Sequence, residues 1–129
     1  MPTRTVVSTD KAPPPLPVYS QAIVCNGMVY CSGQVAIDPA TKKFNEGGIE
    51  GRTYLNRTPV NARADQTGVQ KQCLTNLSEV LTAAGSSIDN VVKISAFLTT
   101  MDNFAAFNRE YEKWFGNLKP ANWSMQAIV

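Results

Sequence analysis

The side chains that could do chemistry in this sequence do not include histidine. The 129 residues contain 12 Lys and Arg, 10 Asp and Glu and 3 Cys, but 0 His. This composition excludes the Ser-His and Cys-His catalytic pairs, the usual zinc sites and the two-histidine ribonuclease mechanism. Any acid–base step must therefore use a carboxylate, a tyrosine, a lysine, a cysteine or bound water.

The charge pattern does not indicate a nucleic-acid or membrane surface. The formal net charge is +2, and three arginines, Arg52, Arg57 and Arg63, lie within one short segment. Removing these three would leave a net charge of −1, so the positive balance belongs to that segment alone. Neither nucleic acid nor a membrane is expected as a partner.

The cysteines favour a reducing compartment. Cys25, Cys31 and Cys73 are odd in number and lack CxxC spacing, and no stretch resembles a signal peptide or a membrane span. Cytoplasm is the expected compartment, with a mitochondrion as the alternative. Cys31 lies between apolar neighbours, so we expect a small buried hydrophobe there.

The first half of the sequence predicts strands followed by a helix. Apolar runs at residues 22–25 and 28–34 flank Asn26-Gly27, which favours a type I′ turn and predicts a β-hairpin. A short strand is expected from Thr3 to Val7, before a proline run. Apolar residues then recur in steps of three and four from about Thr67, which predicts a helix that Gly85 ends.

The second half predicts a strand, a helix and a further short strand. Val91 to Leu98 is typical of a buried strand, and Asp102 can cap a second helix whose aromatic stripe we interpret as core packing. A final strand would run from Ser124 to Val129. The predicted fold class is α+β in a single domain, residues 1–129, with two helices on one face of a mixed sheet.

Five segments of the sequence together resemble one family. They are Pro17-Val18-Tyr19-Ser20-Gln21-Ala22, Val29-Tyr30-Cys31-Ser32-Gly33-Gln34-Val35, Ala83-Ala84-Gly85-Ser86-Ser87, Val91-Val92-Lys93-Ile94-Ser95-Ala96-Phe97-Leu98, and Asp102-Asn103-Phe104 through Tyr111. In this order they resemble the RidA (YjgF-like, L-PSP endoribonuclease-like) imine deaminases, over residues 3–49 and about 66–121.

The resemblance implies a chorismate-mutase-like fold and a cofactor-free reaction. Family members assemble as homotrimers with ligand clefts between subunits. They hydrolyse 2-iminopropanoate and 2-iminobutanoate, the reactive products of pyridoxal-phosphate-dependent dehydratases, to 2-oxo acids and ammonia. The expected partner is thus a small 2-imino or 2-oxo acid, with no metal or organic cofactor. Such chemistry suits a chain without histidine, because a protonated imine is electrophilic enough for a correctly placed water.

The resemblance also suggests which residues border the cleft. Tyr19 would line it as the catalytic-site tyrosine, the turn Ser32-Gly33-Gln34 would present polar groups to the ligand, and Asp102 would lie nearby. Each has a structural alternative: Tyr19 as a packing residue with a bonded hydroxyl, Ser32-Gly33 as a bulge or strand end, and Asp102 as the helix cap alone.

The sequence departs from the family where the substrate carboxylate should bind. After Lys119-Pro120-Ala121 the family carries an arginine, whereas this chain has Asn122. The glutamate that places the water and the closing strand that carries it also lack counterparts, so the last strand segment is expected to be missing or altered. A hydrogen bond to a charged group contributes about 1.5–3 kcal/mol, and Asn122 is only a partial substitute for a bidentate guanidinium. We therefore expect impaired catalysis.

A second departure is an insertion at about residues 51–65. This stretch has no sustained period, and Pro59 interrupts it, so an exposed loop is predicted. Its arginines could bind an anion or RNA, but a solvated insertion without function is the simpler interpretation. One hypothesis explains both departures: the reading frame includes unspliced intron or a wrong gene end.

Two rival functions remain open from the sequence. The first is a non-catalytic trimeric relative, ligand-binding or chaperone-like, that keeps the cleft without the arginine. The second is a ribonuclease or translation inhibitor, which needs acid–base pairs that the sequence does not reveal.

Overall fold

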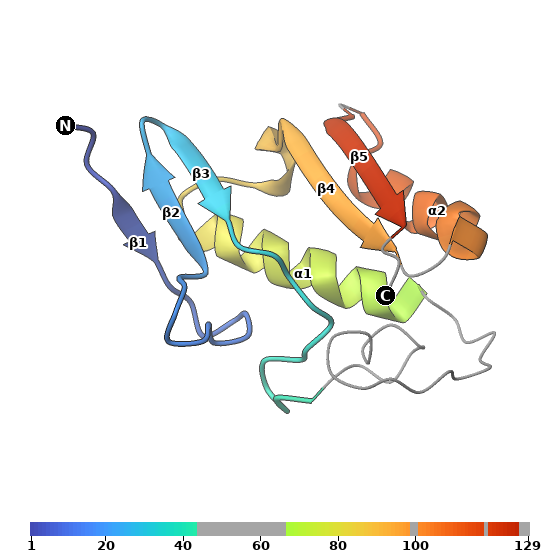
Figure 1. Ribbon diagram of the computed structural model, residues 1–129, viewed down its shortest axis with the longest axis horizontal. Coiled ribbons are helices and arrows are strands. Elements are labelled where there is room, and N and C mark those ends of the chain that lie inside the picture. The colour runs from blue at the N-terminus through green and yellow to red at the C-terminus, as the bar shows by residue number, and fades with distance from the viewer. Residues whose placement is uncertain (44–66, 99–100, 118, 127–129) are drawn as a thin grey trace.

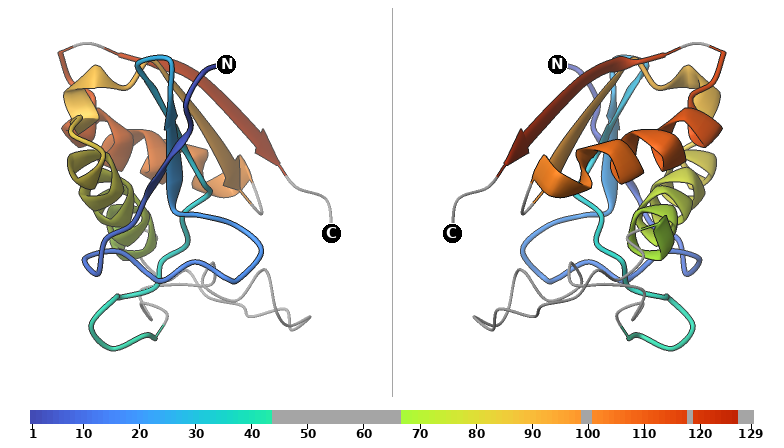
Figure 2. Two further views of the ribbon diagram at one scale, coloured as in Figure 1. Left: turned by 90° about the vertical axis from the view of Figure 1, so that its left-hand side faces the viewer. Right: turned by 90° about the vertical axis from the view of Figure 1, so that its right-hand side faces the viewer.

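The computed structural model describes residues 1–43, 67–98, 101–117 and 119–126 of the chain. Five strands lie in one layer and the two α-helices pack against one face of it (Figures 1 and 2). The α+β class and the placement of the helices are therefore confirmed. The inserted loop predicted at residues 51–65 lies outside the described residues.

The first three strands form an antiparallel sheet in the order β1 (Thr5–Val7), β2 (Ala22–Cys25) and β3 (Met28–Cys31). The predicted hairpin is confirmed, because Asn26 and Gly27 have φ angles of 51° and 73°, as a type I′ turn requires. β3 is shorter than expected and ends at Cys31, so the segment from Ser32 leaves the sheet.

The helix α1 (Thr67–Ala83) ends as the sequence predicts. Gly85 has φ 78°, and its N–H donates to the carbonyl of Thr82 at 3.0 Å, while the N–H of Ser86 donates to the carbonyl of Leu81 at 2.9 Å. These two bonds form a Schellman motif, which satisfies carbonyls at the end of the helix. A short 3-10 turn, η2 (Ile88–Asn90), leads to the next strand.

The C-terminal strands, β4 (Lys93–Leu98) and β5 (Ala121–Gln126), are parallel and are connected through η3 (Met101–Asn103) and α2 (Phe104–Trp114). β5 begins three residues before the predicted Ser124. The buried strand expected from Val91 is wrong in two respects: Val92 precedes β4 and is 64% exposed, and Phe97 is 56% exposed. Phe97 is exposed because the helices cover only one face of the sheet layer, whereas Val92 lies outside the strand.

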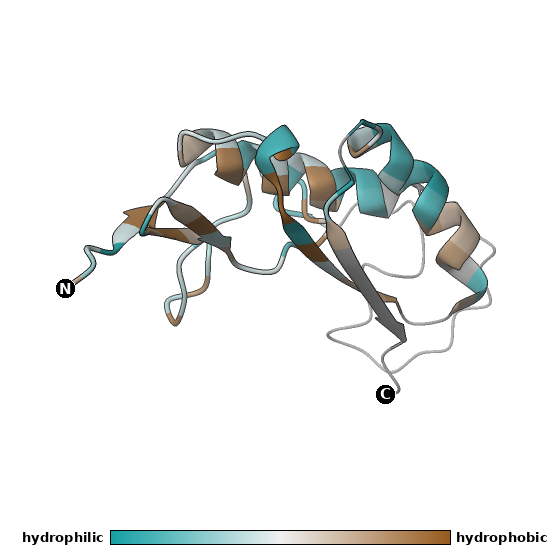
Figure 3. Ribbon diagram, turned by 90° about the horizontal axis from the view of Figure 1, so that it is seen from above, coloured by the Kyte–Doolittle hydropathy of each residue, from teal (hydrophilic) through white to brown (hydrophobic). Residues whose placement is uncertain are grey.

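Two separate apolar clusters hold the helices to the strands. Figure 3 shows the two helices along one side of the strand layer. Val80 of α1 packs under the antiparallel sheet, whereas Leu74 of α1 packs with aromatic residues of α2 under β4. The buried members are Val7, Ala12, Ala22 and Val80 in the first cluster and Leu74, Phe107, Tyr111 and Phe115 in the second. The core interpretation of the aromatic stripe is therefore confirmed, except that Phe104 is 37% exposed.

The single mixed sheet of the prediction is found in two hydrogen-bonded parts. Among the described strands, the order is β1-β2-β3 in one sheet and β4-β5 in the other. The parts are not joined because no described strand lies between β3 and β4. Within the same described residues, no helix is both long and apolar enough to cross a membrane.

Candidate functional site

The first group of predicted site residues lies where the proline-rich segment enters β2 and the chain leaves β3. The Ser32 hydroxyl donates to the carbonyl of Ser20 at 2.6 Å, and the Ser32 N–H donates to the carbonyl of Gln21 at 3.0 Å. These bonds hold Ser32 against the residue that follows Tyr19. The Tyr19 side chain is 48% exposed, so it borders solvent rather than the core.

Gln21 is the residue that fixes this group, and the sequence analysis did not single it out. Its side chain is 3% exposed. Its Oε1 accepts from the N–H of Thr9 at 2.7 Å, and its Nε2 donates to the carbonyls of Thr9, Ala12 and Pro13 at 3.0, 3.3 and 2.9 Å. The amide thus ties the loop before Tyr19 to the start of β2. In the sequence, the only sign of this role was the position of a glutamine directly before the apolar run of β2.

The turn after Ser32 is open to a ligand. Gly33 is exposed, and an added Cβ would meet no atom within 4 Å, so a side chain would fit at this position. The Gln34 Nε2 donates to the carbonyl of Ser32 at 3.2 Å, which folds the turn back on itself. The predicted neighbours Tyr19, Ser32, Gly33 and Gln34 therefore lie close together.

The remaining predicted residues lie on the parallel strands and their connection. Asp102 lies in η3, directly before α2, with an exposed side chain. Asn122 is the second residue of β5 and pairs with Ile94, near the start of β4. Leu98 ends β4 four residues later, so about 13 Å of strand separates the level of Asn122 from the end that leads to Asp102.

The described part of one chain thus brings four of the six residues together and leaves two apart. Ser32 is hydrogen-bonded to Ser20, the residue that follows Tyr19, while Asp102 and Asn122 lie at opposite ends of the β4–β5 pair. The family resemblance had implied a cleft between subunits, so residues that are apart in one chain do not contradict it. Their positions within the chain are set by strand register, which is a tertiary property.

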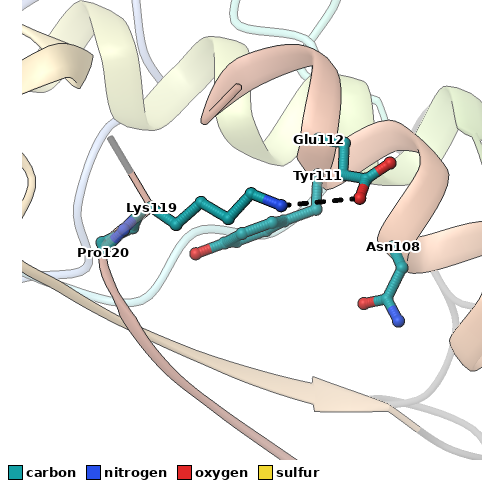
Figure 4. Close-up of a pocket in the computed structure, with 5 residues that line it drawn as sticks. All are labelled: Asn108, Tyr111, Glu112, Lys119 and Pro120. Atoms are coloured by element: carbon teal, nitrogen blue, oxygen red, sulfur yellow. Dashed lines mark ion pairs between the residues drawn. The ribbon is translucent and has the colours of Figure 1, made fainter. Parts of the chain in front are cut away.

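The pocket of about 250 Å³ seen in Figure 4 is lined by none of these residues. It lies between α2 and the segment that enters β5, where Lys119 Nζ is 3.7 Å from Glu112 Oε1. Both of these side chains are about two-thirds exposed, so the ion pair is weak. Its other lining residues are Asn108, Tyr111 and Pro120. Because the charged side chains of this pocket are solvated and the family resemblance points to the other residues, the polar turn at Ser32 is taken as the candidate site.

The cysteines and the described carboxylates add no metal site. No group of three His, Cys, Asp or Glu residues that could hold a metal occurs in the described ranges. Burial raises the pKa of the Cys31 thiol, and it raises the pKa of Cys73 to about 11. Both thiols are therefore protonated and weakly nucleophilic at neutral pH.

Comparison with known proteins decides the family. The chain matches the family model described as endoribonuclease L-PSP over residues 9–128. The chain belongs to this family, which is also named RidA or YjgF. The resemblance in the five sequence segments is therefore confirmed.

Individual relatives show how much of the chain is shared. The protein mmf1, mitochondrial, of Schizosaccharomyces pombe is 41% identical over 121 residues, which are 94% of this chain and 62% of that protein. The 2-iminobutanoate/2-iminopropanoate deaminase of Capra hircus is 34% identical over 126 residues, covering 98% and 80% of the two chains. The crystal structure of yeast Mmf1 superposes on this structure with a TM-score of 0.77 and 35% sequence identity. The match covers 97% of this chain and 86% of the yeast chain.

Proposed function

We propose that this protein is a RidA-type deaminase, which hydrolyses 2-iminopropanoate and 2-iminobutanoate to 2-oxo acids and ammonia. The observation that carries the proposal is the 34% identity over 98% of the chain to a relative named for this activity. Relatives with the same name in Bos taurus and Mus musculus have 34% and 35% identity. The function requires no cofactor, because water attacks an imine that is already electrophilic when protonated.

The chain's own contribution to such a reaction is to position the substrate and water. The Ser32 hydroxyl has donated its hydrogen to Ser20, so its oxygen lone pairs remain available to accept from an ammonium or a water. The exposed backbone of Gly33 can approach a ligand closely, and Tyr19 offers a phenol at the solvent boundary. Holding the substrate and the water in this way lowers the activation free energy of hydrolysis without a pair of acid and base side chains.

We further propose that carboxylate binding is weak in this chain. Asn122 occupies the place of the family's arginine and offers two neutral donors in place of a charged fork. Loss of two charge-assisted hydrogen bonds corresponds to roughly a 100-fold or greater loss in kcat/KM. The same residue favours the alternative of a non-catalytic, ligand-binding relative, whereas a ribonuclease has only the family's description in its support.

A homotrimer with clefts between subunits is part of the proposal. Tyr19 with the Ser32 turn, and Asn122 with its strand, lie in different parts of one chain, so a neighbouring subunit is a natural way to complete a cleft. The uncovered sheet face supplies apolar surface for such an assembly, since Tyr30 and Phe97 are 61% and 56% exposed. Light scattering tests the assembly, and a clean monomer would contradict the intersubunit cleft.

The activity test couples the protein to a threonine dehydratase and follows release of 2-oxobutanoate. The Asn122→Arg variant is expected to accelerate release at least about 100-fold over the unmodified chain. Ser124→Arg, which adds the same charge two residues further along β5, is the matched control and is expected to leave the rate unchanged.

Three outcomes separate the possibilities. If the unmodified chain matches an intact family member, the proposal of a missing carboxylate clamp is wrong. If neither the chain nor Asn122→Arg accelerates release, the deaminase proposal fails and the non-catalytic alternative gains support. Rescue by Ser124→Arg as well would show a general charge effect instead of a specific clamp.

A further inference from the structure

Among the side chains that the structure describes, the Tyr111 hydroxyl is the one buried polar group without a hydrogen-bond partner. The residue is 8% exposed and lies in the aromatic cluster of α2, with its ring centroid 4.6 Å from that of Phe115. A buried hydroxyl without a partner costs free energy, because it has lost its hydrogen bonds to water. A phenylalanine would fill the same space in the cluster without that cost, so packing alone does not explain the hydroxyl.

The same residue lines the pocket between α2 and the segment that enters β5, which has a volume of about 250 Å³. Asn108, Tyr111 and Glu112 lie on one face of α2, because residues three and four apart on a helix are neighbours. Lys119 and Pro120 line the opposite side. In Figure 4 the Tyr111 hydroxyl points toward this second side and away from Asn108.

The Lys119 side chain covers Tyr111 and is held only weakly. Figure 4 shows its aliphatic stem running across the Tyr111 ring, with the ammonium group reaching Glu112. Lys119 Nζ is 3.7 Å from Glu112 Oε1, and the two side chains are 64% and 66% exposed, so solvent screens their attraction. A ligand that pairs with the lysine can therefore displace it and open the hydroxyl to the pocket.

The lining groups combine charges of opposite sign with apolar surface. Lys119 supplies an ammonium group and Glu112 a carboxylate. Burial raises the pKa of the Tyr111 hydroxyl, so this group stays protonated at neutral pH and is a hydrogen-bond donor. The Tyr111 ring and the buried Pro120 supply apolar contact.

The charges and the volume restrict the kind of ligand. A simple anion would pair with Lys119 but would be repelled by the Glu112 carboxylate beside it, and a simple cation would meet the reverse difficulty. A molecule that carries both charges pairs with both side chains. The volume of 250 Å³ equals that of roughly eight water molecules at about 30 Å³ each, which suits a small molecule only.

From these observations we propose that this pocket binds a small zwitterionic amino acid with an apolar side chain. The carboxylate of the ligand accepts from Lys119 and from the Tyr111 hydroxyl, its ammonium group pairs with Glu112, and its side chain lies against Pro120. None of these residues belongs to the proposed deaminase site, so the proposal does not depend on that reaction.

The test titrates the full chain with L-valine and follows the NMR chemical shifts. Saturable changes are expected at the side-chain amide of Asn108 and at the backbone amides of Glu112 and Lys119. The melting temperature of the protein is expected to rise with the valine concentration. Absence of saturable changes, or changes confined to the turn at Ser32, would overturn the proposal.

Two analogues of valine test the requirement for both charges. 3-Methylbutanoate lacks the ammonium group and isobutylamine lacks the carboxylate, while both keep the branched apolar part. Each is expected to bind at least about tenfold more weakly than valine, because each loses a charge-assisted hydrogen bond. Equal affinity for valine and either analogue would contradict a zwitterion site.

The variant Tyr111→Phe removes the hydroxyl alone. Because that hydroxyl has no partner in the empty protein, the melting temperature is expected to stay equal or to rise, while the affinity for valine falls at least about tenfold. Tyr30→Phe is the control, since it removes a hydroxyl from a side chain that is 61% exposed, and it is expected to change neither quantity. A lower melting temperature for Tyr111→Phe would show that the hydroxyl has a partner within the fold, and the proposal would be wrong.

Two charge variants assign the ends of the ligand. Lys119→Met is expected to abolish the preference for valine over isobutylamine, and Glu112→Gln the preference for valine over 3-methylbutanoate. Both side chains are exposed, so both variants are expected to fold. Glu79→Gln in α1 removes the same charge away from the pocket and is expected to keep both preferences. An equal effect of Glu79→Gln would assign the preferences to net charge and would overturn the proposed site.

Discussion

The two strand groups of this molecule differ in the range of the contacts that build them. The antiparallel group lies within residues 5–31, and its central connection is the two-residue turn Asn26-Gly27. The parallel group joins Lys93–Leu98 to Ala121–Gln126, and the connection between them contains α2. Local turn chemistry determines the first group, whereas tertiary packing must hold the second.

The buried polar groups of the two regions differ in charge. Gln21 beside the antiparallel sheet is neutral and bonds to backbone atoms. Glu110 in α2 is 4% exposed and accepts from Lys113 at 2.7 Å and from Trp114 at 3.2 Å. The hydrogen bond from Lys113 is the main cause that lowers the pKa of this carboxyl. The two regions should therefore respond differently to truncation and to pH.

The largest expected effect is on the aromatic cluster of the second region. Phe107→Ala removes a side chain that is 8% exposed and stacks on Tyr111 with ring centroids 5.7 Å apart. It is expected to lower the free energy of unfolding by about 3–5 kcal/mol in urea titration. Hydrogen exchange should show β4 and β5 losing protection before β2 and β3, because their cluster is separate.

The neighbouring Phe104→Ala serves as the control, since that side chain is 37% exposed, and about 1 kcal/mol or less is expected. Equal loss of protection in both strand groups would show one cooperative unit. The two strand groups would then unfold together, and the difference between their contacts would not give them different stabilities.

The intermediate effect concerns the neutral amide of the first region. Gln21→Ala leaves the N–H of Thr9 and three carbonyls to find other partners, so a loss of about 1–3 kcal/mol is expected by thermal or urea unfolding. Gln34→Ala removes one part-buried bond and is expected to cost under about 1 kcal/mol. Similar losses for the two variants would contradict the anchoring role of Gln21.

The smallest expected effect is the pH dependence of the second region. Because the folded pKa of Glu110 lies below its unfolded value, its stabilising contribution is present above the unfolded value. That contribution is lost as the pH falls through the folded pKa, because the carboxyl is then protonated in both states. Glu110→Gln should reduce the loss of unfolding free energy that the unmodified chain shows as the pH falls into the acid range. Gln21→Ala should lower the unfolding free energy by the same amount at every pH, because its amide does not titrate. Parallel curves for Glu110→Gln and the unmodified chain would contradict this assignment.

Much of the fold could be predicted because local chemistry fixed it. Asn26-Gly27 determined the hairpin and Gly85 the end of α1, since both need positive φ angles. The prediction failed at Val92 and at the single mixed sheet, because exposure and strand partners depend on which segments lie alongside. Of the candidate site, the link between Tyr19 and the Ser32 turn could be foreseen only through the family resemblance.

The sequence by itself determined the absence of histidine chemistry, the α+β class, the family and the replacement of its arginine by Asn122. Residue types and short-range spacing suffice for these, because propensity, turn geometry and motifs are local properties. Only the tertiary structure decided that the Gln21 side chain anchors the loop before Tyr19, and that Asn122 and Asp102 lie at opposite strand ends. Register and burial arise from contacts between distant segments, which spacing along the chain does not specify.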